Sequence, residues 1–142
     1  MITFDTEIRV WYVDTDQMGI VHHSNYIKYY EEARSAFMRH LGVSYADMEA
    51  SGVLMPILHV ESDYKRSARY DDLLTVRITI KDIPIARFVA NYEVYNATGE
   101  LLNTGSTTLG FLNKTTMRPC RAPEWFVEML QREMEKNPTD NE

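Results

Sequence analysis

Five stretches of the chain alternate between hydrophobic and polar residues, which is the pattern of strands that bury one face. The most regular runs from Leu73 to Asp82. Its apolar face carries Leu74, Val76, Ile78 and Ile80, and its polar face carries Thr75, Arg77, Thr79 and Lys81. This alternation predicts a strand in an antiparallel sheet with one solvated side. Weaker alternation predicts strands over residues 4–12, 53–65, 86–96 and 100–112, with a hairpin turn at Ala97-Thr98-Gly99.

Helical spacing begins after the first predicted strand and the loop that follows it. The apolar positions step by three or four residues and comprise Tyr26, Tyr30, Ala33, Phe37 and Leu41. This spacing predicts a long helix that is capped by Ser24 and stopped by Gly42. A short helix capped by Ser44 is predicted over residues 43–51, and a last helix carries Pro123 in its first turn.

The predicted order is one strand, a long helix, a short helix, four strands and a last helix. Long strands with one apolar face need cover, and the long helix can provide it. We therefore expect an α+β fold, in which a curved antiparallel sheet of about five strands wraps around that helix. The 142 residues suffice for one core, so we expect a single domain over residues 1–136 and a polar tail over 137–142 that frays.

Composition narrows the class of protein. Hydrophobic residues make up 44% of the chain and charged residues 25%, which is ordinary for a globular protein. No apolar run approaches the roughly 20 residues that span a bilayer, and residues 1–5 lack the features of a signal peptide, so we expect a cytoplasmic protein without a membrane span. The net charge of -6 argues against nucleic-acid binding. The single cysteine, Cys120, excludes an intramolecular disulfide and a multi-thiolate metal site.

Titratable side chains concentrate in the loop between the first strand and the long helix. Asp14, Asp16, His22 and His23 lie there together with Gly19. A loop that only joined two elements would not need this density of titratable groups, so we take it as the candidate active site. A glycine lets the backbone pass close to a ligand, and the first amides of a helix can offer hydrogen bonds to an anion.

Asp16 is the candidate catalytic group of this loop. A carboxylate can attack a carbonyl carbon or activate a water molecule, although a loop aspartate more often caps a turn, and both interpretations stay open. His23 has three interpretations: a group that orients or protonates a ligand, a hydrogen-bonding residue at the helix start, or half of a metal site with His22. Adjacent histidines chelate one ion poorly because they point in different directions, so we expect no metal.

Two further features can serve a ligand. Lys65, Arg66 and Arg69 form a basic cluster at a predicted turn, where they could bind phosphate groups or serve solubility alone. Glu31 lies one position off the aromatic stripe of the long helix. It is either solvated or, if the sheet wraps the helix closely, near the catalytic loop.

Three segments carry a family likeness. The main one reads Tyr12-Val13-Asp14-Thr15-Asp16-Gln17-Met18-Gly19-Ile20-Val21-His22-His23-Ser24-Asn25-Tyr26, continued by Tyr29-Tyr30-Glu31-Glu32-Ala33-Arg34. It resembles the hotdog-fold acyl-CoA thioesterases of the 4-hydroxybenzoyl-CoA thioesterase-like superfamily, and within them the branch that includes the Tol-Pal-associated enzymes. Residues 64–73 and 114–123 resemble two further segments of that family, a turn with an Ala-Arg pair and an arginine-proline segment before the last helix.

The resemblance implies a hotdog fold and hydrolysis of an acyl-CoA thioester without a cofactor. It implies that Asp16, three residues before Gly19, is the catalytic carboxylate, and that His23 and Glu31 are further catalytic positions. The positions implied for the oxyanion and substrate are Gly19, Ile20, Val21 and Tyr26, and those for CoA are Lys65, Arg66 and Arg69. The chain departs from the family pattern at His22, where tyrosine is common, and at Ser67, where proline is common.

Two other functions compete with hydrolysis. One is dehydration of an acyl thioester by a hotdog-fold enzyme, and the other is non-catalytic acyl-CoA binding. The Asp-x-x-Gly spacing favours the hydrolase, and the chain has no second domain to carry a regulatory output. The exposed edges of such a sheet predict dimerisation. The resemblance implies dimers that pair into tetramers, with sites at the subunit interface.

Overall fold

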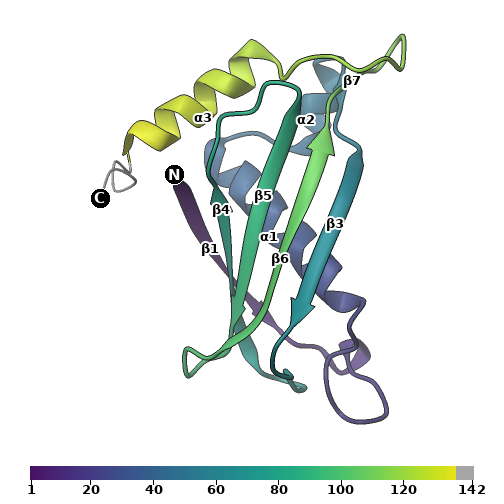
Figure 1. Ribbon diagram of the computed structural model, residues 1–142, viewed down its shortest axis with the longest axis vertical. Helices are drawn as coiled ribbons and strands as arrows, with labels where there is room; N and C mark the ends of the chain where they lie inside the picture. The colour runs from purple at the N-terminus through teal and green to yellow at the C-terminus, as the bar shows by residue number, and fades with distance from the viewer. Residues whose placement is uncertain (137–142) are drawn as a thin grey trace.

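The computed structural model describes residues 1–136, in which five strands form one antiparallel sheet. In spatial order the strands are β1 (Ile2–Arg9), β4 (Leu73–Ile80), β5 (Arg87–Tyr95), β6 (Leu101–Gly110) and β3 (Ile57–Tyr64). The long helix α1 (Asn25–Leu41) lies behind this sheet in the view of Figure 1. The predicted α+β architecture, with a sheet wrapped around one long helix, is confirmed.

The core lies between α1 and the inner face of the sheet. The helix buries Tyr26, Tyr30, Ala33 and Phe37, which are four of the positions that the helical spacing selected. On β4 the predicted alternation holds, since one face is buried and the other is only half-buried. Burial of each large apolar side chain stabilises a fold by about 1.5–3 kcal/mol, so these two surfaces account for much of the attraction between helix and sheet.

Two shorter helices complete the fold. The helix α2 (Tyr45–Ala50) begins with the predicted cap, in which the Asp47 N–H donates to Ser44 Oγ at 3.1 Å. The helix α3 (Glu124–Lys136) crosses one end of the sheet in Figure 1, directly after Pro123. Its buried Phe126 ring packs edge-on against Phe88, with ring centroids 5.6 Å apart. The predicted tail over residues 137–142 lies outside the described residues, and the single domain stays a prediction.

The predictions of one continuous strand over residues 53–65 and another over residues 100–112 were wrong, because each range contains two separate strands. The first is divided into β2 (Val53–Leu54) and β3, and the second ends at Gly110, before the short strand β7 (Leu112–Asn113). The short strands pair with each other in a separate two-stranded sheet. Pro56 lies at the first division, where it has no N–H to continue a ladder, although its carbonyl accepts the Gly110 N–H at 2.9 Å.

The first strand ends at Arg9 rather than at Tyr12. Residues Tyr12–Asp14 form a short 3₁₀ turn, η1, whose start is fixed by a bond from the Trp11 N–H to Asp14 Oδ2 at 3.1 Å. An alternation pattern does not report this bond, because it depends on the aspartate side chain folding back onto the backbone.

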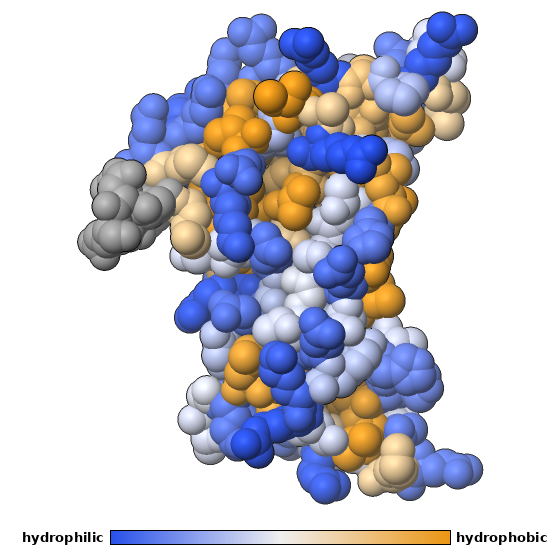
Figure 2. Space-filling view, in the orientation of Figure 1, coloured by the Kyte–Doolittle hydropathy of each residue, from blue (hydrophilic) through white to orange (hydrophobic). Residues whose placement is uncertain are grey.

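The two edges of the sheet are β1 and β3. The outward face of the sheet is mostly hydrophilic or neutral in Figure 2, whereas hydrophobic surface follows the edge formed by β3. Ile57 and Leu58 contribute to this edge, with 46% and 51% of their surface exposed. Among residues 1–136, no helix has the length and apolar character needed to cross a membrane.

Candidate active site

The loop between η1 and α1 folds into a small hairpin around Asp16 and Gly19. The Asp16 N–H donates to the Ile20 carbonyl at 2.9 Å, and the Gly19 N–H donates to the Asp16 carbonyl at 3.0 Å. An isolated bridge between Thr15 and Val21 closes the hairpin. Gly19 has a φ of 78°, in the left-handed region that glycine adopts without steric cost. The tight turn therefore explains why this position carries a glycine.

The hairpin is anchored on the turn that joins β3 to β4. The Val21 N–H donates to the Ala68 carbonyl at 2.8 Å, and Ile20 forms an isolated bridge with Arg69. Val21 and Ala68 are both buried. Two segments that are distant in the sequence therefore form one continuous wall, which brings the predicted basic cluster next to the Asp16 loop.

The Asp16 carboxylate has one engaged oxygen and one available oxygen. Its Oδ1 accepts the Met18 N–H at 2.8 Å, which is the bond of an Asx turn. Within residues 1–136, its Oδ2 accepts no hydrogen bond from the protein. The turn-capping interpretation of Asp16 therefore accounts for only one of the two oxygens.

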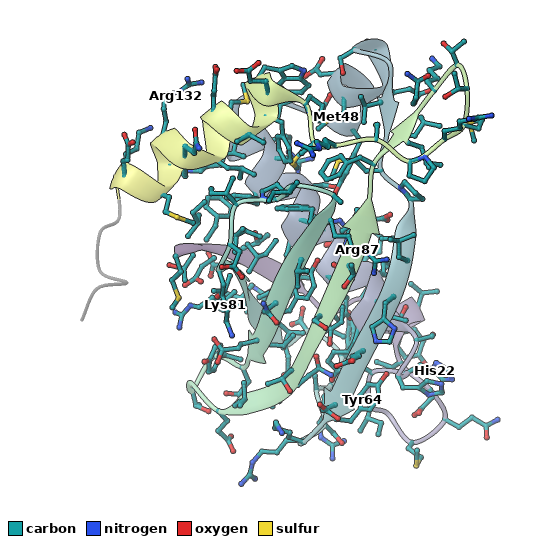
Figure 3. All side chains as sticks on the ribbon, turned by 45° about the horizontal axis from the view of Figure 1, so that its top comes forward. His22, Met48, Tyr64, Lys81, Arg87 and Arg132 are labelled. Atoms are coloured by element: carbon teal, nitrogen blue, oxygen red, sulfur yellow. The ribbon has the colours of Figure 1, made fainter. Side chains whose placement is uncertain are left out.

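A cleft of about 270 Å³ lies between the Asp16 loop and the end of β3. Its walls carry Asp16, Met18, Ile20, Val21, His23, Tyr26, Tyr64, Lys65, Arg66 and Ser67. In Figure 3, Tyr64 and the neighbouring His22 lie at the end of the molecule opposite to Arg132 on α3. The fold thus assembles in one place most of the residues that the sequence singled out. Gly19 and Arg69 adjoin the cleft through the hairpin and its anchor.

The rings of the two adjacent histidines lie against each other, with centroids 4.2 Å apart, so the expectation that they point in different directions was wrong. Each histidine also has a partner of its own. His22 Nδ1 lies 2.8 Å from Ser24 Oγ, and His22 is absent from the cleft wall. The His23 ring lies edge-on to the Tyr64 ring, and the Tyr64 hydroxyl donates to the His23 carbonyl at 3.2 Å. His23 is therefore the histidine that faces the cleft. In the part of the chain that the structure describes, no three potential metal ligands cluster.

The predicted capping bond of Ser24 was wrong. Ser24 has φ −63° and ψ −23°, which are already helical, and its side chain makes no cap bond to the helix. The hydroxyl instead contacts His22, because a residue in helical conformation directs its side chain away from the amides that a cap would reach.

Most backbone amides at the start of α1 are occupied by protein acceptors. The occupied amides are those of Val21, His22, Ser24, Asn25 and Tyr26. Among the described residues, the His23 N–H in the middle of this run donates to no protein acceptor. An available amide at the helix start is therefore that of His23, a residue that lines the cleft.

The three residues of the basic cluster differ in whether they form an ion pair. Arg66 Nη1 lies 3.5 Å from Glu100 Oε2, in an exposed ion pair of the kind that is worth at most about 1 kcal/mol. Lys65 and Arg69 form no ion pair with any described residue, and both side chains are exposed. Two cationic groups at the cleft are therefore available to an anionic ligand, and a third is weakly engaged.

Glu31 of the same chain does not line the cleft. It is exposed on α1 and is absent from the residues that line the space around Asp16. The catalytic position implied for Glu31 by the family resemblance stays a prediction, and one chain does not provide its contact with Asp16.

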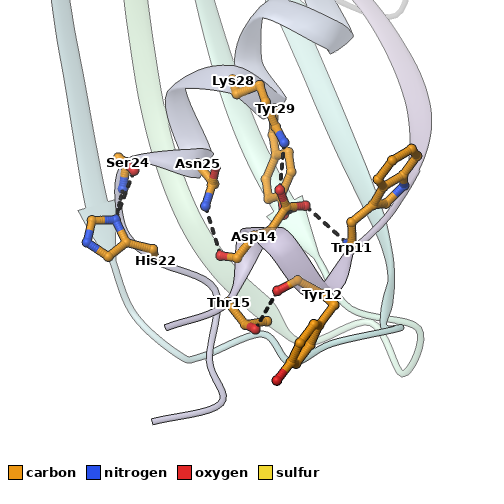
Figure 4. Close-up of polar contacts among 9 residues, drawn as sticks. All are labelled: Trp11, Tyr12, Asp14, Thr15, His22, Ser24, Asn25, Lys28 and Tyr29. Atoms are coloured by element: carbon orange, nitrogen blue, oxygen red, sulfur yellow. Dashed lines mark hydrogen bonds and ion pairs between the residues drawn. The ribbon is translucent and has the colours of Figure 1, made fainter. Parts of the chain in front are cut away.

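Sequence reasoning missed the importance of Asp14. This carboxylate is only 2% exposed and lies among Trp11, Lys28 and Tyr29, as Figure 4 shows. Burial alone would raise its pKa, but hydrogen bonds from Lys28, the Trp11 N–H and Tyr29 together hold the pKa of Asp14 below its ordinary value. The available signal was a lysine and a tyrosine in the first turns of the helix that follows the Asp-Thr-Asp run.

A sequence profile of the thioesterase-like superfamily matches residues 10–130, which include the loop, the cleft and most of the sheet. The chain belongs to the thioesterase-like superfamily. The acyl-CoA thioesterase YbgC of Helicobacter pylori is 34% identical over 130 residues, which cover 86% of this chain and 96% of that protein. The acyl-CoA thioester hydrolase YbgC of Escherichia coli O6:H1 is 30% identical over 124 residues, which cover 87% of this chain and 92% of that protein.

The fold of this superfamily member is also shared with solved structures. A DHNA-CoA thioesterase from Staphylococcus aureus has a TM-score of 0.86 and 35% sequence identity, covering 99% of this chain and 94% of that chain. The predicted superfamily, the hotdog fold and the thioester hydrolase class are thus confirmed. Membership of the Tol-Pal-associated branch stays a prediction.

Proposed function

We propose that this protein hydrolyses acyl-CoA thioesters to a free acid and CoA, with Asp16 as the catalytic carboxylate. The observation that carries the proposal is the environment of Asp16. Asp16 has one oxygen that accepts no hydrogen bond from the described residues, and it lines a cleft together with His23 and the cationic Lys65. The names of relatives that cover most of this chain, acyl-CoA thioesterase and acyl-CoA thioester hydrolase, support the substrate class.

Two chemical routes start from Asp16. As a nucleophile, Oδ2 attacks the thioester carbon, the carbon–sulfur bond breaks, CoA leaves as a thiolate, and water then hydrolyses the mixed anhydride. As a general base, the carboxylate removes a proton from a water molecule that attacks the same carbon. Label in the Asp16 carboxylate after single-turnover hydrolysis in ¹⁸O-water identifies the nucleophilic route with water attack at the aspartyl carbonyl, because the general-base route places label only in the released acid.

Both routes create negative charge on the thioester oxygen. We assign its stabilisation to the His23 N–H, because the neighbouring amides are already engaged. Loss of one such donor typically lowers kcat by about 10²–10³-fold, so a single amide is sufficient to matter. The His23 imidazole borders the same space, where it can orient the thioester or protonate the leaving thiolate.

The phosphates of CoA are assigned to the basic turn. Lys65 and Arg69 are the main candidates because they have no competing ion pair among the described residues, and Arg66 is a weaker one because Glu100 engages it. Gly19, Ile20, Val21 and Tyr26 form the wall between this turn and Asp16, and we propose that they contact the thioester end of the ligand.

We further propose that two copies pair along β3. This strand is an edge of the sheet, and it exposes the apolar Ile57 and Leu58. Unpaired backbone groups on such an edge are stabilised by a second strand. Antiparallel self-pairing about the middle of β3 places the Tyr64 end of one copy opposite the Ile57 end of the other. A monomer in sedimentation experiments would contradict this part of the proposal, and further pairing into tetramers stays a prediction.

This pairing provides a place for the acyl group. Near the Ile57 end of β3 lies a cavity of about 380 Å³, with mainly apolar walls that include Met48, Met55 and Met117. In the proposed dimer this cavity of one copy adjoins the Asp16 cleft of the other. Glu31, which one chain does not bring to Asp16, would then act in a site shared by two copies.

The function is tested with a panel of acyl-CoAs and a thiol reagent. Sustained release of free CoA thiol together with the free acid supports hydrolysis. Loss of water with the thioester intact would identify a dehydratase, and tight binding without thiol release would identify a binding module. Either of the last two results would overturn the proposal. The same panel identifies the preferred acyl group, and the cytoplasmic location stays a prediction.

A further inference from the structure

Asp14 lies two residues before Asp16 but does not line the cleft. Its side chain instead accepts hydrogen bonds from three groups. Oδ1 accepts from Lys28 Nζ at 2.7 Å, and Oδ2 accepts from the Tyr29 hydroxyl at 3.0 Å and from the Trp11 N–H at 3.1 Å. Two of these donors belong to α1, so the carboxylate joins the start of the loop to the helix that follows it.

The main chain of Asp14 joins the same two parts. Its carbonyl accepts the His22 N–H at 2.8 Å and Asn25 Nδ2 at 2.8 Å. Figure 4 shows the contacts of Asp14 with Asn25, Lys28, Tyr29 and Trp11. Both ends of the loop from Thr15 to Val21 are therefore held at Asp14. Asp16 lies near the first end of this loop, and His23 follows the second end.

A turn-capping role does not require this arrangement. The bond to the Trp11 N–H alone would cap η1, and an exposed carboxylate could supply it at little cost. Asp14 is buried, and burial of a charge is unfavourable unless it is paired and hydrogen-bonded. The additional bonds to Lys28 and Tyr29 compensate for that cost, and they fix the loop to α1 rather than to η1.

We propose that Asp14 is a positioning residue that sets the Asp16 carboxylate against the His23 N–H. This inference rests on the proposed hydrolysis of acyl-CoA at Asp16. A carboxylate nucleophile or base and an oxyanion donor must be held together within a fraction of an ångström, and a misplacement of about 1 Å can cost about 10²-fold in rate. Asp14 meets this requirement because it holds both flanks of the loop.

Two adjacent tyrosines of α1 provide a matched test. Tyr29 and Tyr30 are both fully buried, and each has a hydrogen-bonded hydroxyl. The Tyr29 hydroxyl bonds to Asp14, whereas the Tyr30 hydroxyl bonds to Ser62 and Asn103 on the sheet. Tyr29→Phe and Tyr30→Phe therefore remove the same group from equivalent burial, but only the first affects the loop.

We expect Tyr29→Phe to lower kcat about tenfold and Asp14→Asn to lower it about 10²-fold, with KM for acyl-CoA changed less than about threefold. Tyr30→Phe should leave kcat at the wild-type value, even if it lowers Tm as much as Tyr29→Phe does. Equal kcat values for the two phenylalanine variants would overturn the inference, and so would wild-type kcat in folded Asp14→Asn. The tyrosine pair decides the matter if Asp14→Asn does not fold.

Hydrogen exchange of the His22 amide gives a second test that needs no catalysis. This amide donates to the Asp14 carbonyl, so Tyr29→Phe should accelerate its exchange at least tenfold, and Tyr30→Phe should not. Unchanged exchange in Tyr29→Phe would contradict the positioning role. If the wild-type protein released no thiol from any acyl-CoA, the proposed function would fail, and the exchange experiment would still show whether Asp14 orders the loop.

Discussion

Gly19 and Arg69 are neighbours across the wall of the cleft, since a Cβ built on Gly19 would lie 3.9 Å from Arg69 Nη1. This distance is an ordinary van der Waals contact. The hairpin that presents Asp16 is joined to the turn that carries the cationic side chains by the bridge between Ile20 and Arg69. A substitution of Gly19 is therefore expected to alter both the position of the loop and the binding of the ligand. The cause would be the strained backbone conformation rather than steric overlap of the new side chain.

Gly19→Ala should destabilise the protein by about 1 kcal/mol, because alanine is strained at the φ of 78°. It should also lower kcat/KM for acyl-CoA by about tenfold or more, since relief of that strain moves Asp16. Chemical denaturation and steady-state kinetics measure the two effects. Gly99→Ala is the matched control, because Gly99 has a φ of 85° and open space around it in a distant hairpin. It should lose similar stability and keep kcat/KM, and a parallel loss of activity in both variants would contradict this account.

Replacement of both Lys65 and Arg69 by alanine should raise KM for acyl-CoA by about 10-fold or more, because two charge-assisted contacts to phosphate are lost. KM for the matching acyl-pantetheine, which lacks the nucleotide, should change little. The wild-type KM for acyl-CoA should also rise with salt more steeply than that of the double variant. Lys81→Ala serves as a control for the loss of positive charge outside the cleft. Equal effects on acyl-CoA and acyl-pantetheine would remove the basic turn from CoA binding.

Gly105→Ala should destabilise the protein strongly. A Cβ at this position would collide with the Tyr30 hydroxyl and would lie 2.6 Å from the Glu61 carbonyl oxygen. The Tyr30 ring is fully buried and the Glu61 oxygen belongs to the backbone of a paired strand, so neither partner can move freely. Overpacking of this kind costs about 1–3 kcal/mol. Gly110→Ala, whose Cβ would meet the flexible end of Leu58 at 3.1 Å, should cost less. Urea denaturation of both variants checks the order, and a smaller loss for Gly105→Ala would show that the Tyr30 network yields easily.

The pH dependence of stability should reflect Asp14. Its pKa in the folded protein lies below the ordinary value of 3.8, so the unfolded chain takes up the proton first as the pH falls. The contribution of Asp14 is therefore complete above about pH 5 and is lost as the pH falls through the lowered pKa. The asparagine side chain of the Asp14→Asn variant does not titrate. The difference in unfolding free energy between wild type and this variant, about 1–3 kcal/mol near pH 6, should shrink toward about pH 3. A difference that stayed constant with pH would contradict this assignment.

Local spacing was sufficient to predict α1, the strand β4 and the hairpin at Gly99. Each of these features is dictated by the burial of one face or by a glycine conformation, and both leave a mark on neighbouring residues. The division at Pro56 was not predicted, because alternation continues on either side of this proline. The physical reason for that error is that a chain can continue in an extended direction while its partner strand changes.

The site was predictable in part. Asp16 and His23 were found because they carry titratable groups in a loop, and the structure places both in one cleft. The orientation of Ser24 toward His22 was not predictable, because it depends on contacts between side chains rather than on local pattern. The burial of Asp14 had only an indirect signal, the lysine and the tyrosine in the first turns of the following helix. The proposed pairing of two copies concerns the rest of the site, and no periodicity within one chain reports which edge of a sheet meets a partner.

The central claim is that Asp16 carries out thioester hydrolysis, and the most direct measurement is the turnover of Asp16→Asn on the best acyl-CoA of the panel. Asparagine keeps an oxygen that can accept the Met18 N–H, so the turn should persist and the fold should be retained. We predict that kcat falls by about 10²–10⁴-fold, the range for loss of a positioned acid–base group, with circular dichroism and Tm close to wild type. A folded Asp16→Asn protein that releases CoA thiol at near the wild-type rate would contradict the account.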